Sequence, residues 1–458
     1  MINSGDTAWL IISSALVLLM TPGLAFFYGG LVRESDVVNT IKMSFISLAV
    51  IALEWALVGY SLSFAPGSPI LGGMSWIGLS GVGAEPNADY SATTPHLAFM
   101  TFQMMFAIIT PALISGAIVG RMKFKVYVLF ILLWGLIVYN PIAHWVWGVG
   151  GWLRQLGAID FAGGSVVHIS AGVSALVAAM ILGPREAAHA ENKTPHNVPF
   201  VILGASLLWF GWFGFNAGSA LTAGGLASLA FVTTNLSAAA AVVTWVLIEI
   251  AFKGKPTGVG AAIAAVVGLV AITPAAGFVT PLASIAIGAI AAAVCYAAMR
   301  LLGRSRIDDT LDVFACHGVG GIVGALLTGV FATTSVNPAG ANGLFYGNPR
   351  LILLQGISVS ATAGLAAVGT GAIMMALKFA IGLRPAQLDE ARGIDDIEHG
   401  VGAYALETGL ARMQVNGHHL ARQQRPVSEP SSKGLVGKPE SIRGGGNDVT
   451  PTPHQRWS

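Results

Sequence analysis

The chain has 458 residues, of which 54% are hydrophobic and only 10% are charged, and its mean hydropathy is +0.71. A soluble domain carries about 25% charged residues, so this composition excludes an ordinary soluble protein and indicates a polytopic membrane protein. The formal net charge of +2 argues against nucleic acid as a partner. The two cysteines, Cys295 and Cys316, both lie in apolar segments, so we expect no disulfide framework.

Apolar segments of about 20 residues, each long enough to cross a bilayer as a helix, recur along the chain. We predict an all-α fold with eleven transmembrane helices. No basic region precedes the first segment, so we expect no cleavable signal peptide. The break between the eighth and ninth segments, ITPAAGFVTP, is the least distinct. In chain order the segments are 8–31, 43–64, 97–119, 126–148, 165–182, 199–218, 228–252, 258–276, 280–302, 315–333 and 351–382.

The Lys and Arg residues between these segments predict the orientation of the chain. One set of connections carries twelve of them, whereas the alternate set carries only Arg154 and Arg350. Cytoplasmic loops are enriched in Lys and Arg, so the N-terminus is predicted to lie outside and the C-terminus inside. The twelve are Arg33, Lys42, Arg121, Lys123, Lys125, Arg185, Lys193, Lys253, Lys255, Arg300, Arg304 and Arg306.

Two histidines occupy matching positions, His168 in the fifth segment and His317 in the tenth, and each follows an aspartate, Asp160 or Asp309, by eight residues. Repeats of five segments insert in opposite directions, so this match predicts inverted five-helix repeats plus an eleventh helix, with a substrate path at their interface. Beyond the D-x7-H match the internal similarity is weak. Asp160 has two interpretations that can hold together, a helix N-cap and a source of negative potential in a vestibule.

An ionisable ring in a membrane segment is costly and indicates function. A neutral imidazole offers one donor and one acceptor, so the pair is suited to pass a hydrogen bond along, bind a small polar molecule or relay a proton. A metal site is the rival interpretation, but it needs a third or fourth ligand. No cluster of Cys, Met and His residues supplies one, so we expect neither a metal nor another cofactor.

Aromatic side chains gather near the predicted outer ends of three segments. Phe102 and Phe106 share one helix face, Trp147 ends the fourth segment, and the sixth carries LLWFGWFGFNAGSAL, with Trp212, Phe215, Asn216 and Ser219. Such residues are typical of an interfacial belt. They also suit a cation–π cup for a small ammonium ion, with the Ser219 hydroxyl as acceptor. The residues alone leave both interpretations open.

The C-terminal part of the chain changes in character. Residues 384–409 are charged and patterned, and beyond Leu410 the chain is rich in Gly, Pro, Ser, Gln and His. We predict a transmembrane domain at 1–383, an ordered cytoplasmic region at 384–409 and a disordered tail at 410–458. Glu54, inside the second segment, has no firm explanation at this level.

Eight strings in the chain are similar to the Amt/MEP/Rh family of ammonium transporters, on its bacterial Amt branch. They are TPGLAFFYGGLVR (21–33), GYSLSF (59–64), FQMMFAIITPALISGA (102–117), PIAHWVWGVGGW (141–152), DFAGGSVVHISAG (160–172), WFGWFGFNAGSAL (209–221), DVFACHGVGGIVG (312–324) and GIDDIEHGVGAY (393–404). The resemblance implies an ammonium transporter for nitrogen uptake, not an enzyme. It also implies a homotrimer in the bacterial cytoplasmic (inner) membrane, surrounded by membrane lipids, with one pore in each protomer.

The resemblance also implies roles for particular residues. Ammonium, or its analogue methylammonium, would bind outside at Phe106, Trp147 and Ser219 and then meet a gate formed by Phe106 and Phe215. His168, His317 and Trp212 would line the pore, and Asp160 matches the family's vestibule aspartate. Deprotonated ammonia would pass the imidazoles, while the proton returns outside or crosses separately. Potassium has no proton to give up and would be excluded.

A PII-type signal protein docks beneath bacterial relatives, so the resemblance implies this partner too. The C-terminal string GIDDIEHGVGAY (393–404) departs from the family pattern at GIDD and at Val401 and Gly402. These departures put regulation by a PII-type protein in doubt, but they do not affect the prediction of transport. The main alternative function is an ammonium sensor with little transport, although the short polar tail lacks the size of a signalling domain. A metal transporter and an alternating-access carrier are further rivals, disfavoured by missing ligands and by the scarcity of charged residues within the segments.

Overall fold

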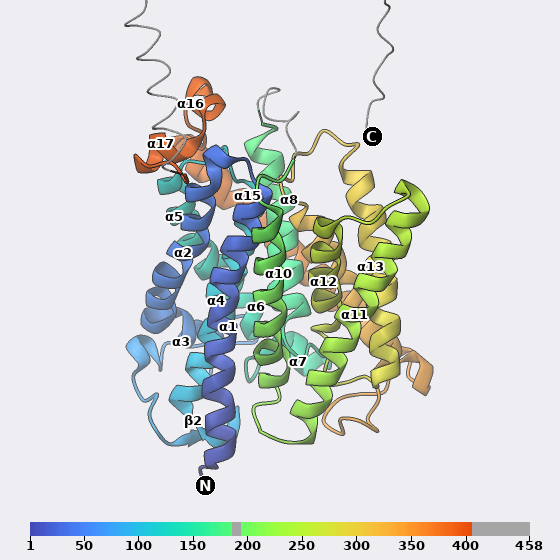
Figure 1. Ribbon diagram of the computed structural model, residues 1–458. Helices are drawn as coiled ribbons and strands as arrows, with labels where there is room; N and C mark the ends of the chain where they lie inside the picture. Colours follow the sequence, from blue (N-terminus) through green and yellow to red (C-terminus); the bar gives the residue numbers. More distant parts are fainter. Residues whose placement is uncertain (186–193, 405–458) are drawn as a thin grey trace, which may run out of the picture. The chain divides into compact units, whose positions relative to one another are not determined.

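The computed structural model describes residues 1–185 and 194–404, and Met1–Ala403 form one compact unit (Figure 1). The predicted tail at 410–458, residues 405–409 and Lys193 lie outside the described residues. The main helices are α1 (Ser4–Leu31), α2 (Val37–Glu54), α4 (His96–Ile114), α5 (Phe124–Trp134), α6 (Asn140–Trp147), α8 (Ser170–Leu182), α10 (Val198–Trp212), α11 (Gly225–Lys253), α12 (Gly258–Ile272), α13 (Pro281–Leu302), α14 (Gly320–Phe331) and α15 (Arg350–Ile381).

Shorter elements extend or connect these helices. Five π-helical stretches continue a neighbouring helix, and π-helical turns occur frequently at functional sites. They are η2 (Trp55–Gly59), η5 (Gly135–Tyr139), η6 (Gly164–Ile169), η7 (Phe213–Ala217) and η8 (Phe314–Val319). The remaining short helices are α3 (Tyr60–Phe64), α7 (Trp152–Leu156), α16 (Gln387–Arg392), α17 (Ile394–His399), and the 3₁₀ turns η1 (Glu34–Asp36), η3 (Ile77–Leu79), η4 (Ser115–Ala117) and η9 (Leu344–Tyr346).

The predicted polytopic helical fold is confirmed, with two departures. The described part of the chain contains ten helical segments that are long and apolar enough to cross a membrane. The eighth predicted segment, 258–276, is wrong at its end because α12 stops at Ile272, and its 15 residues span only about 22 Å. Pro274, which lacks an N–H, follows in a turn. The count of eleven spans therefore stays a prediction. Sequence reasoning also missed a short antiparallel pair, β1 (Pro86–Asn87) and β2 (Ser91–Pro95).

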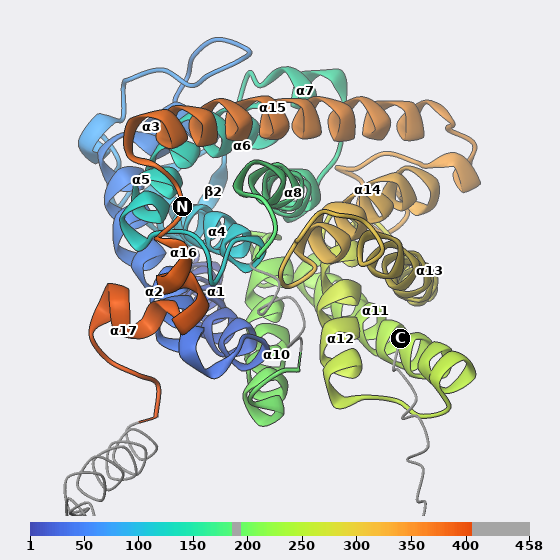
Figure 2. The same cartoon turned by 90° about the horizontal axis from the view of Figure 1, so that it is seen from above.

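The two halves of the chain lie on two sides of the helical unit. Figure 2 shows α2 to α6 on one side and α11 to α14 on the other, with α8 near the middle. The long helix α15 packs against α5, α8 and α14 along one edge (Figure 2). The N-terminus lies at the end that holds β2, whereas α16 and α17 lie at the opposite end (Figure 1).

Close backbone contact brings the two halves together at the level of the histidines. A Cβ atom at Gly172 would lie 2.1 Å from the backbone nitrogen of Gly318, a distance that real Cβ atoms do not adopt. Glycine at both positions therefore lets α8 and η8 cross almost in backbone contact, as small residues do in membrane bundles. His168 lies one turn before Gly172 and His317 lies directly before Gly318, so this crossing determines the separation of the two imidazoles.

The buried carboxyl group of Glu54 finds a partner on another helix. The Asn140 Nδ2 group donates a 2.7 Å hydrogen bond to Glu54 Oε1, and the Ser63 hydroxyl donates to Asn140 Oδ1 at 3.3 Å. A Cβ atom at Gly59 would lie 2.7 Å from Glu54 Oε2, so the carboxyl group occupies the space that this glycine leaves. Glu54 therefore joins α2 to α6 in the interior of the bundle, a pairing that the sequence did not reveal.

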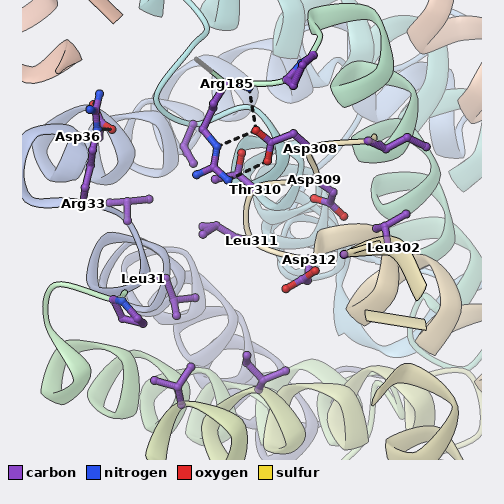
Figure 3. Close-up of a pocket in the computed structure, with 18 of the residues that line it drawn as sticks. Leu31, Arg33, Asp36, Arg185, Leu302, Asp308, Asp309, Thr310, Leu311 and Asp312 are labelled. Carbon is purple, nitrogen blue, oxygen red and sulfur yellow. Dashed lines mark hydrogen bonds and ion pairs between the residues drawn. The ribbon is translucent and has the colours of Figure 1, made fainter. Parts of the chain in front are cut away.

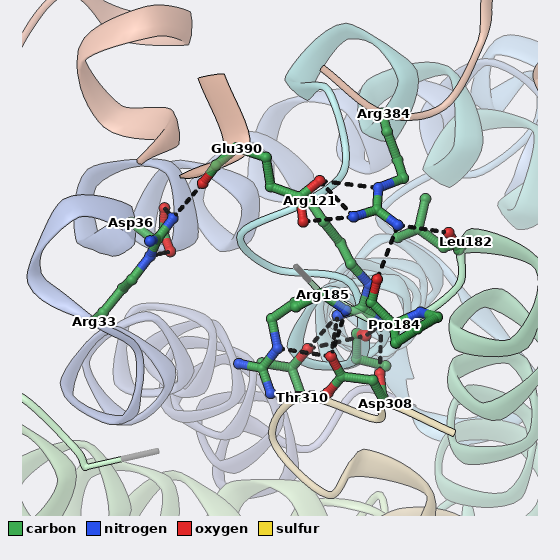
Figure 4. A network of polar contacts seen from close by, with 11 residues as sticks. Arg33, Asp36, Arg121, Leu182, Pro184, Arg185, Asp308, Thr310, Arg384 and Glu390 are labelled. Carbon is green, nitrogen blue, oxygen red and sulfur yellow. Dashed lines mark hydrogen bonds and ion pairs between the residues drawn. The ribbon is translucent and has the colours of Figure 1, made fainter. Parts of the chain in front are cut away.

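The region after α15 is tied to the start of α2. The Asp395 carboxylate accepts hydrogen bonds from the backbone N–H groups of Val38 and Asn39, both at 2.8 Å, and thereby caps α2. Arg384 forms an ion pair with the buried Glu390 at 2.5 Å, and the Arg33 guanidinium donates to the Glu390 carbonyl oxygen at 2.7 Å. Figure 4 shows the contacts of Arg384 and Arg33 with Glu390, beside the ion pairs Arg33–Asp36 and Arg185–Asp308.

Candidate functional site

Three cavities follow one another along α1 and α4. The first, which we call the aromatic pocket, has a volume of about 160 Å³ and includes Gln103 and Phe106 of α4 in its lining. The second, the histidine cavity, leaves only about 10 Å³ and includes Ile109 and Leu113 one and two turns further along α4. The third, the polar cavity, has a volume of about 730 Å³ and begins beyond the end of α1 at Leu31. Successive helix turns therefore line one route through the bundle.

The aromatic pocket brings together three residues that are far apart in the sequence, Phe106, Trp147 and Ser219. The rings of Phe106 and Trp147 meet at 90° with their centroids 5.8 Å apart. The Trp147 indole N–H donates to the Asp160 carbonyl oxygen at 3.0 Å, which holds the ring in place. The Ser219 hydroxyl donates to the Phe215 carbonyl oxygen at 2.8 Å, so the lone pairs of its oxygen stay available as acceptors.

A pair of phenylalanine rings separates the aromatic pocket from the histidine cavity. The centroids of Phe106 and Phe215 are 4.2 Å apart, with 33° between the ring planes, and each side chain is only 1% exposed. The ring of Phe215 continues the stack to His168, at 6.0 Å between centroids. A hydrated ion cannot pass these rings as they stand, because the stack leaves no space between them.

The two histidines contact each other in the narrow cavity. Their Nδ1 atoms are 3.3 Å apart and their rings lie within 29° of parallel. One Nδ1 must donate and the other accept, so the neutral pair presents one donor and one acceptor at its two Nε2 atoms. Trp212 stacks on His168 at 5.4 Å, and its indole N–H donates to Thr273 Oγ1 at 2.9 Å. The remaining lining residues are apolar: Met20, Leu24, Phe27, Ile109, Leu113, Val167, Leu208, Phe215 and Val266.

Asp160 lies at the start of η6 and not in the lining of the aromatic pocket. Its carboxylate accepts backbone hydrogen bonds from Gly163, Gly164 and Ser165 at 2.7–2.8 Å. Burial of this carboxyl group raises its pKa, and the backbone N–H groups oppose that shift. Both oxygens are engaged, which favours the interpretation of Asp160 as an N-cap that orients the histidine-bearing segment.

Sequence reasoning missed further residues of the aromatic pocket, notably Tyr90, Arg154 and Gln103. The Arg154 guanidinium donates to the Trp147 carbonyl oxygen at 2.6 Å, and the Tyr90 hydroxyl donates to the Phe64 carbonyl oxygen at 2.5 Å. Tyr90 comes from the irregular segment beside β2, where no periodic pattern marks it. Within residues 1–185 and 194–404, no group of three or more His, Cys, Asp or Glu side chains is arranged to hold a metal ion.

The polar cavity lies at the opposite end of the route, and its lining combines charged residues with apolar ones (Figure 3). Two of its acidic side chains are paired with arginines. Arg33 contacts Asp36 at 2.5 Å, and Arg185 contacts Asp308 at 2.8 Å. Asp309, the counterpart of Asp160, also lines this cavity. The two mouths of the route therefore differ, because one is aromatic and the other is charged.

A helical membrane bundle with an aromatic pocket, a closed pair of rings and an apolar passage lined by two imidazoles defines a membrane transport protein of the pore type. Comparison with known proteins narrows the class. Residues 8–404 match the Ammonium Transporter Family, and the chain belongs to this family.

An ammonium transporter of Bacillus subtilis is 52% identical over 401 residues, which cover 87% of this chain and 98% of that protein. Among solved structures, Candida albicans Mep2 is 35% identical with a TM-score of 0.80, covering 85% of this chain and 88% of that one. A structure described as a sensor Amt protein is 28% identical with a TM-score of 0.79, covering 86% of this chain and 98% of that one.

Proposed function

We propose that this chain is an ammonium transporter, which binds NH₄⁺ in the aromatic pocket and conducts NH₃ past the two histidines. The observation that carries the proposal is the order of the route: Phe106, Trp147 and Ser219, then the closed ring pair, then His168 and His317 in an apolar passage. The names of the relatives support the same substrate.

The first step is recognition of a cation by aromatic faces. A cation–π contact is worth about 1–2 kcal/mol, and the Ser219 oxygen adds a hydrogen-bond acceptor. These contacts fall short of the free energy that an ion loses when it leaves water for an apolar passage. Removal of one proton abolishes the charge, so NH₃ can enter where NH₄⁺ cannot. The ring pair Phe106 and Phe215 must part to admit it.

The second step is passage along the imidazoles. The histidine cavity is only about 10 Å³, which is at the lower limit for one water-sized molecule. A neutral ammonia molecule of that size can donate to one imidazole nitrogen and accept from another, so the two rings replace part of the hydrogen bonding that ammonia loses when it leaves water. The proton returns outside or crosses separately along the His168–His317 contact. Potassium is excluded because it has no proton to give up.

The setting of the transporter is part of the proposal. We infer a homotrimer in the bacterial inner membrane, with the aromatic pocket outside and the polar cavity facing the cytoplasm, as the Lys and Arg distribution predicts. The ordered region that includes α16 and α17 then lies on the cytoplasmic face, where a PII-type signal protein would dock. We also infer that the chain catalyses no covalent reaction of its own and acts without a cofactor.

Uptake of labelled methylammonium, together with the current that accompanies it, tests the proposal in a host that lacks ammonium transport. The intact chain should restore saturable uptake, and substitution of His168 or His317 should change the rate or the current while the protein still reaches the membrane. Absence of uptake by the intact, membrane-inserted chain would overturn the proposal. Ammonium binding without uptake would favour the alternative function, an ammonium sensor. The similarity to the structure of a sensor Amt protein is the reason to test this alternative.

A further inference from the structure

A single amide side chain of α15 joins three backbone groups from two other parts of the chain. Gln355 lies in the second turn of α15 and is only 2% exposed. Its Oε1 atom accepts a hydrogen bond from the Ile159 N–H at 2.9 Å. Its Nε2 group donates to the carbonyl oxygens of Ile159 at 2.8 Å and Ala325 at 3.2 Å. A glutamine amide has one acceptor oxygen and two N–H donors, so the oxygen and both donors are engaged.

The segment that Gln355 holds has no regular structure of its own. Residues 158–163 form neither a helix nor a strand, so their backbone groups need partners elsewhere. Gln355 pairs with both backbone groups of Ile159, as a neighbouring strand would. Two residues later, the Phe161 N–H donates to the Pro274 carbonyl oxygen at 3.1 Å. The position of this segment therefore depends on contacts with the C-terminal half of the chain.

The same segment anchors a ring of the aromatic pocket. Asp160 follows Ile159 directly, and its carbonyl oxygen accepts the Trp147 indole N–H at 3.0 Å. Trp147 lines the pocket and meets the Phe106 ring at 90°. A cation is attracted to the face of an aromatic ring, so the attraction weakens when the ring turns away. A shift of the Asp160 carbonyl group would therefore move the Trp147 ring and weaken cation binding.

We propose that Gln355 is a positioning residue for ammonium recognition, because it holds the backbone that anchors the Trp147 indole. The bond to Ala325 joins α14 to the same contact. The helix α15 follows the two predicted repeats in the chain and runs along one edge of the unit (Figure 2). Through Gln355 this helix takes part in substrate binding without lining the pocket. The inference rests on the proposed function, because it takes the aromatic pocket as the ammonium site.

A positioning role and a merely structural role predict different kinetics. A structural contact affects the amount of folded protein, which changes the total rate and leaves KM unchanged. A positioning residue changes KM, because it acts on the site where the cation binds. The Asp160 carboxylate caps η6 through its own hydrogen bonds to Gly163, Gly164 and Ser165. The histidine passage, and with it Vmax per inserted protein, should therefore change little when Gln355 is replaced.

Uptake of labelled methylammonium by right-side-out membrane vesicles tests the inference. Gln355→Met keeps a side chain of similar length and removes the amide. We expect KM to rise about three- to tenfold, as a weakened cation–π contact requires, with Vmax per inserted protein within about twofold. An unchanged KM would overturn the inference.

Thr370→Val is the matched control. Thr370 is another buried polar residue of α15, about four turns further along, and its hydroxyl donates to the Ser174 hydroxyl at 2.7 Å. The substitution removes a buried hydrogen bond of the same helix at a distance from the Ile159 segment, so KM should stay within about twofold. An equal rise in KM for Thr370→Val and Gln355→Met would mean that any loosening of α15 has this effect, and the inference would fail.

A double-mutant cycle tests the connection through Trp147. Trp147→Phe keeps an aromatic face but has no N–H group for the Asp160 carbonyl oxygen. In this background Gln355→Met should raise KM by less than twofold, because the connection that it disturbs is already absent. Effects on KM that multiply in the double variant would contradict the inference. Absence of saturable uptake by the intact chain would instead refute the proposed function.

A second measurement covers the case in which Gln355→Met does not reach the membrane. In the intact protein the Ile159 amide donates to the Gln355 oxygen. Coupling between two sites is reciprocal, so saturating methylammonium should slow hydrogen exchange of this amide about three- to tenfold, the factor expected for KM. The Gly254 amide, which ends α11, should exchange at the same rate with and without methylammonium. An Ile159 rate that methylammonium leaves unchanged would contradict the inference.

Discussion

The two segments that carry the histidines share a local sequence motif but lie next to different cavities. Asp160 and Asp309 each stand eight residues before a histidine, and each caps the π-helical turn that leads to it. Both oxygens of Asp160 are engaged by backbone N–H groups, whereas among the described residues only Oδ2 of Asp309 accepts a hydrogen bond, from the Phe314 N–H. The first segment adjoins an aromatic pocket and the second a charged cavity. One local motif therefore occurs in two different polar environments, because the tertiary structure around it differs between the halves.

The largest expected difference between the halves is in stability. Asp160→Ala removes the acceptor of three backbone N–H groups at 2.8 Å or less and should lower the free energy of unfolding by about 3 kcal/mol or more. Asp309→Ala removes fewer backbone hydrogen bonds, so we expect the free energy of unfolding to fall by only about 1–2 kcal/mol. Thermal unfolding in detergent measures both, with the exposed Asp89→Ala as control. Equal losses for the two variants would show that the caps do not differ.

The next prediction concerns selectivity in the histidine cavity. His168→Asp replaces a neutral hydrogen-bonding ring with an acid, so an ion that cannot lose a proton gains a counter-charge in the passage. We expect a potassium current that the intact protein lacks, measured by electrophysiology on reconstituted protein. His317→Asp is the comparison from the second half. A correctly folded His168→Asp variant that stays impermeable to potassium would refute the argument that the neutral passage excludes this ion.

A smaller effect is expected at the aromatic mouth. Ser219→Ala removes an acceptor for ammonium and should raise KM for methylammonium about five- to tenfold with little change in stability. Ser228→Ala is a close control, because both hydroxyls donate to the carbonyl oxygen four residues earlier but Ser228 is exposed on α11. The two KM values should differ clearly. Similar values would remove Ser219 from the proposed substrate site.

The smallest effect is expected where α17 docks on α2. Lys42 Nζ lies 3.0 Å from His399 Nδ1, and His399 Nε2 lies 3.0 Å from Asn39 Oδ1, so the ring is neutral with its proton on Nε2. Burial and the Lys42 charge lower the pKa of His399 below its usual 6.5. The docked state therefore binds a proton less readily than the undocked state, and docking should weaken as the pH falls below 6.5.

Hydrogen exchange of the α2 start measures this docking, because Asp395 protects the Val38 and Asn39 amides. Burial raises the pKa of Asp395 to about 6, so this carboxyl group titrates in the same range, and its protonation favours docking as the pH falls. Protection of these amides is therefore compared between the intact protein and His399→Gln from pH 7.5 to 5.5, after correction for intrinsic exchange. On lowering the pH, protection should fall more, or rise less, in the intact protein than in His399→Gln. An equal pH dependence in the two proteins would show that the charge of Lys42 does not act on His399.

Local patterns in the chain allowed the helices and the chemistry of the passage to be predicted. Long apolar runs with few charges leave the backbone no favourable state in a bilayer other than a helix, so the spans followed from composition and length. The rarity of ionisable rings in such runs made His168 and His317 candidates. The residues alone did not decide between an aromatic belt and a cation site, because both use the same side chains. Only the resemblance to a family assigned roles to Phe106, Trp147 and Ser219.

Other features depend on contacts between distant parts of the chain. Glu54 is paired by Asn140, 86 positions away, and the end of α12 frees Thr273 to accept from Trp212. Neither contact has a signature in the local sequence, because each side chain could equally face lipid, protein or solvent. The same holds for Gln103, Tyr90 and Arg154, which enter the aromatic pocket through the packing of three separate segments.

The sequence by itself determined the class of protein, the helices and the residue types available to a pore, since these follow from hydropathy and from the cost of placing polar groups in lipid. The tertiary structure alone decided which of those residues meet. The backbone crossing of Gly172 and Gly318 brings the two imidazoles within 3.3 Å, across 149 positions of sequence. It also decided that, within the described part of the chain, Asp160 accepts hydrogen bonds at both oxygens and Asp309 at one, because the position of the donors depends on the surrounding backbone and not on the identity of the residue.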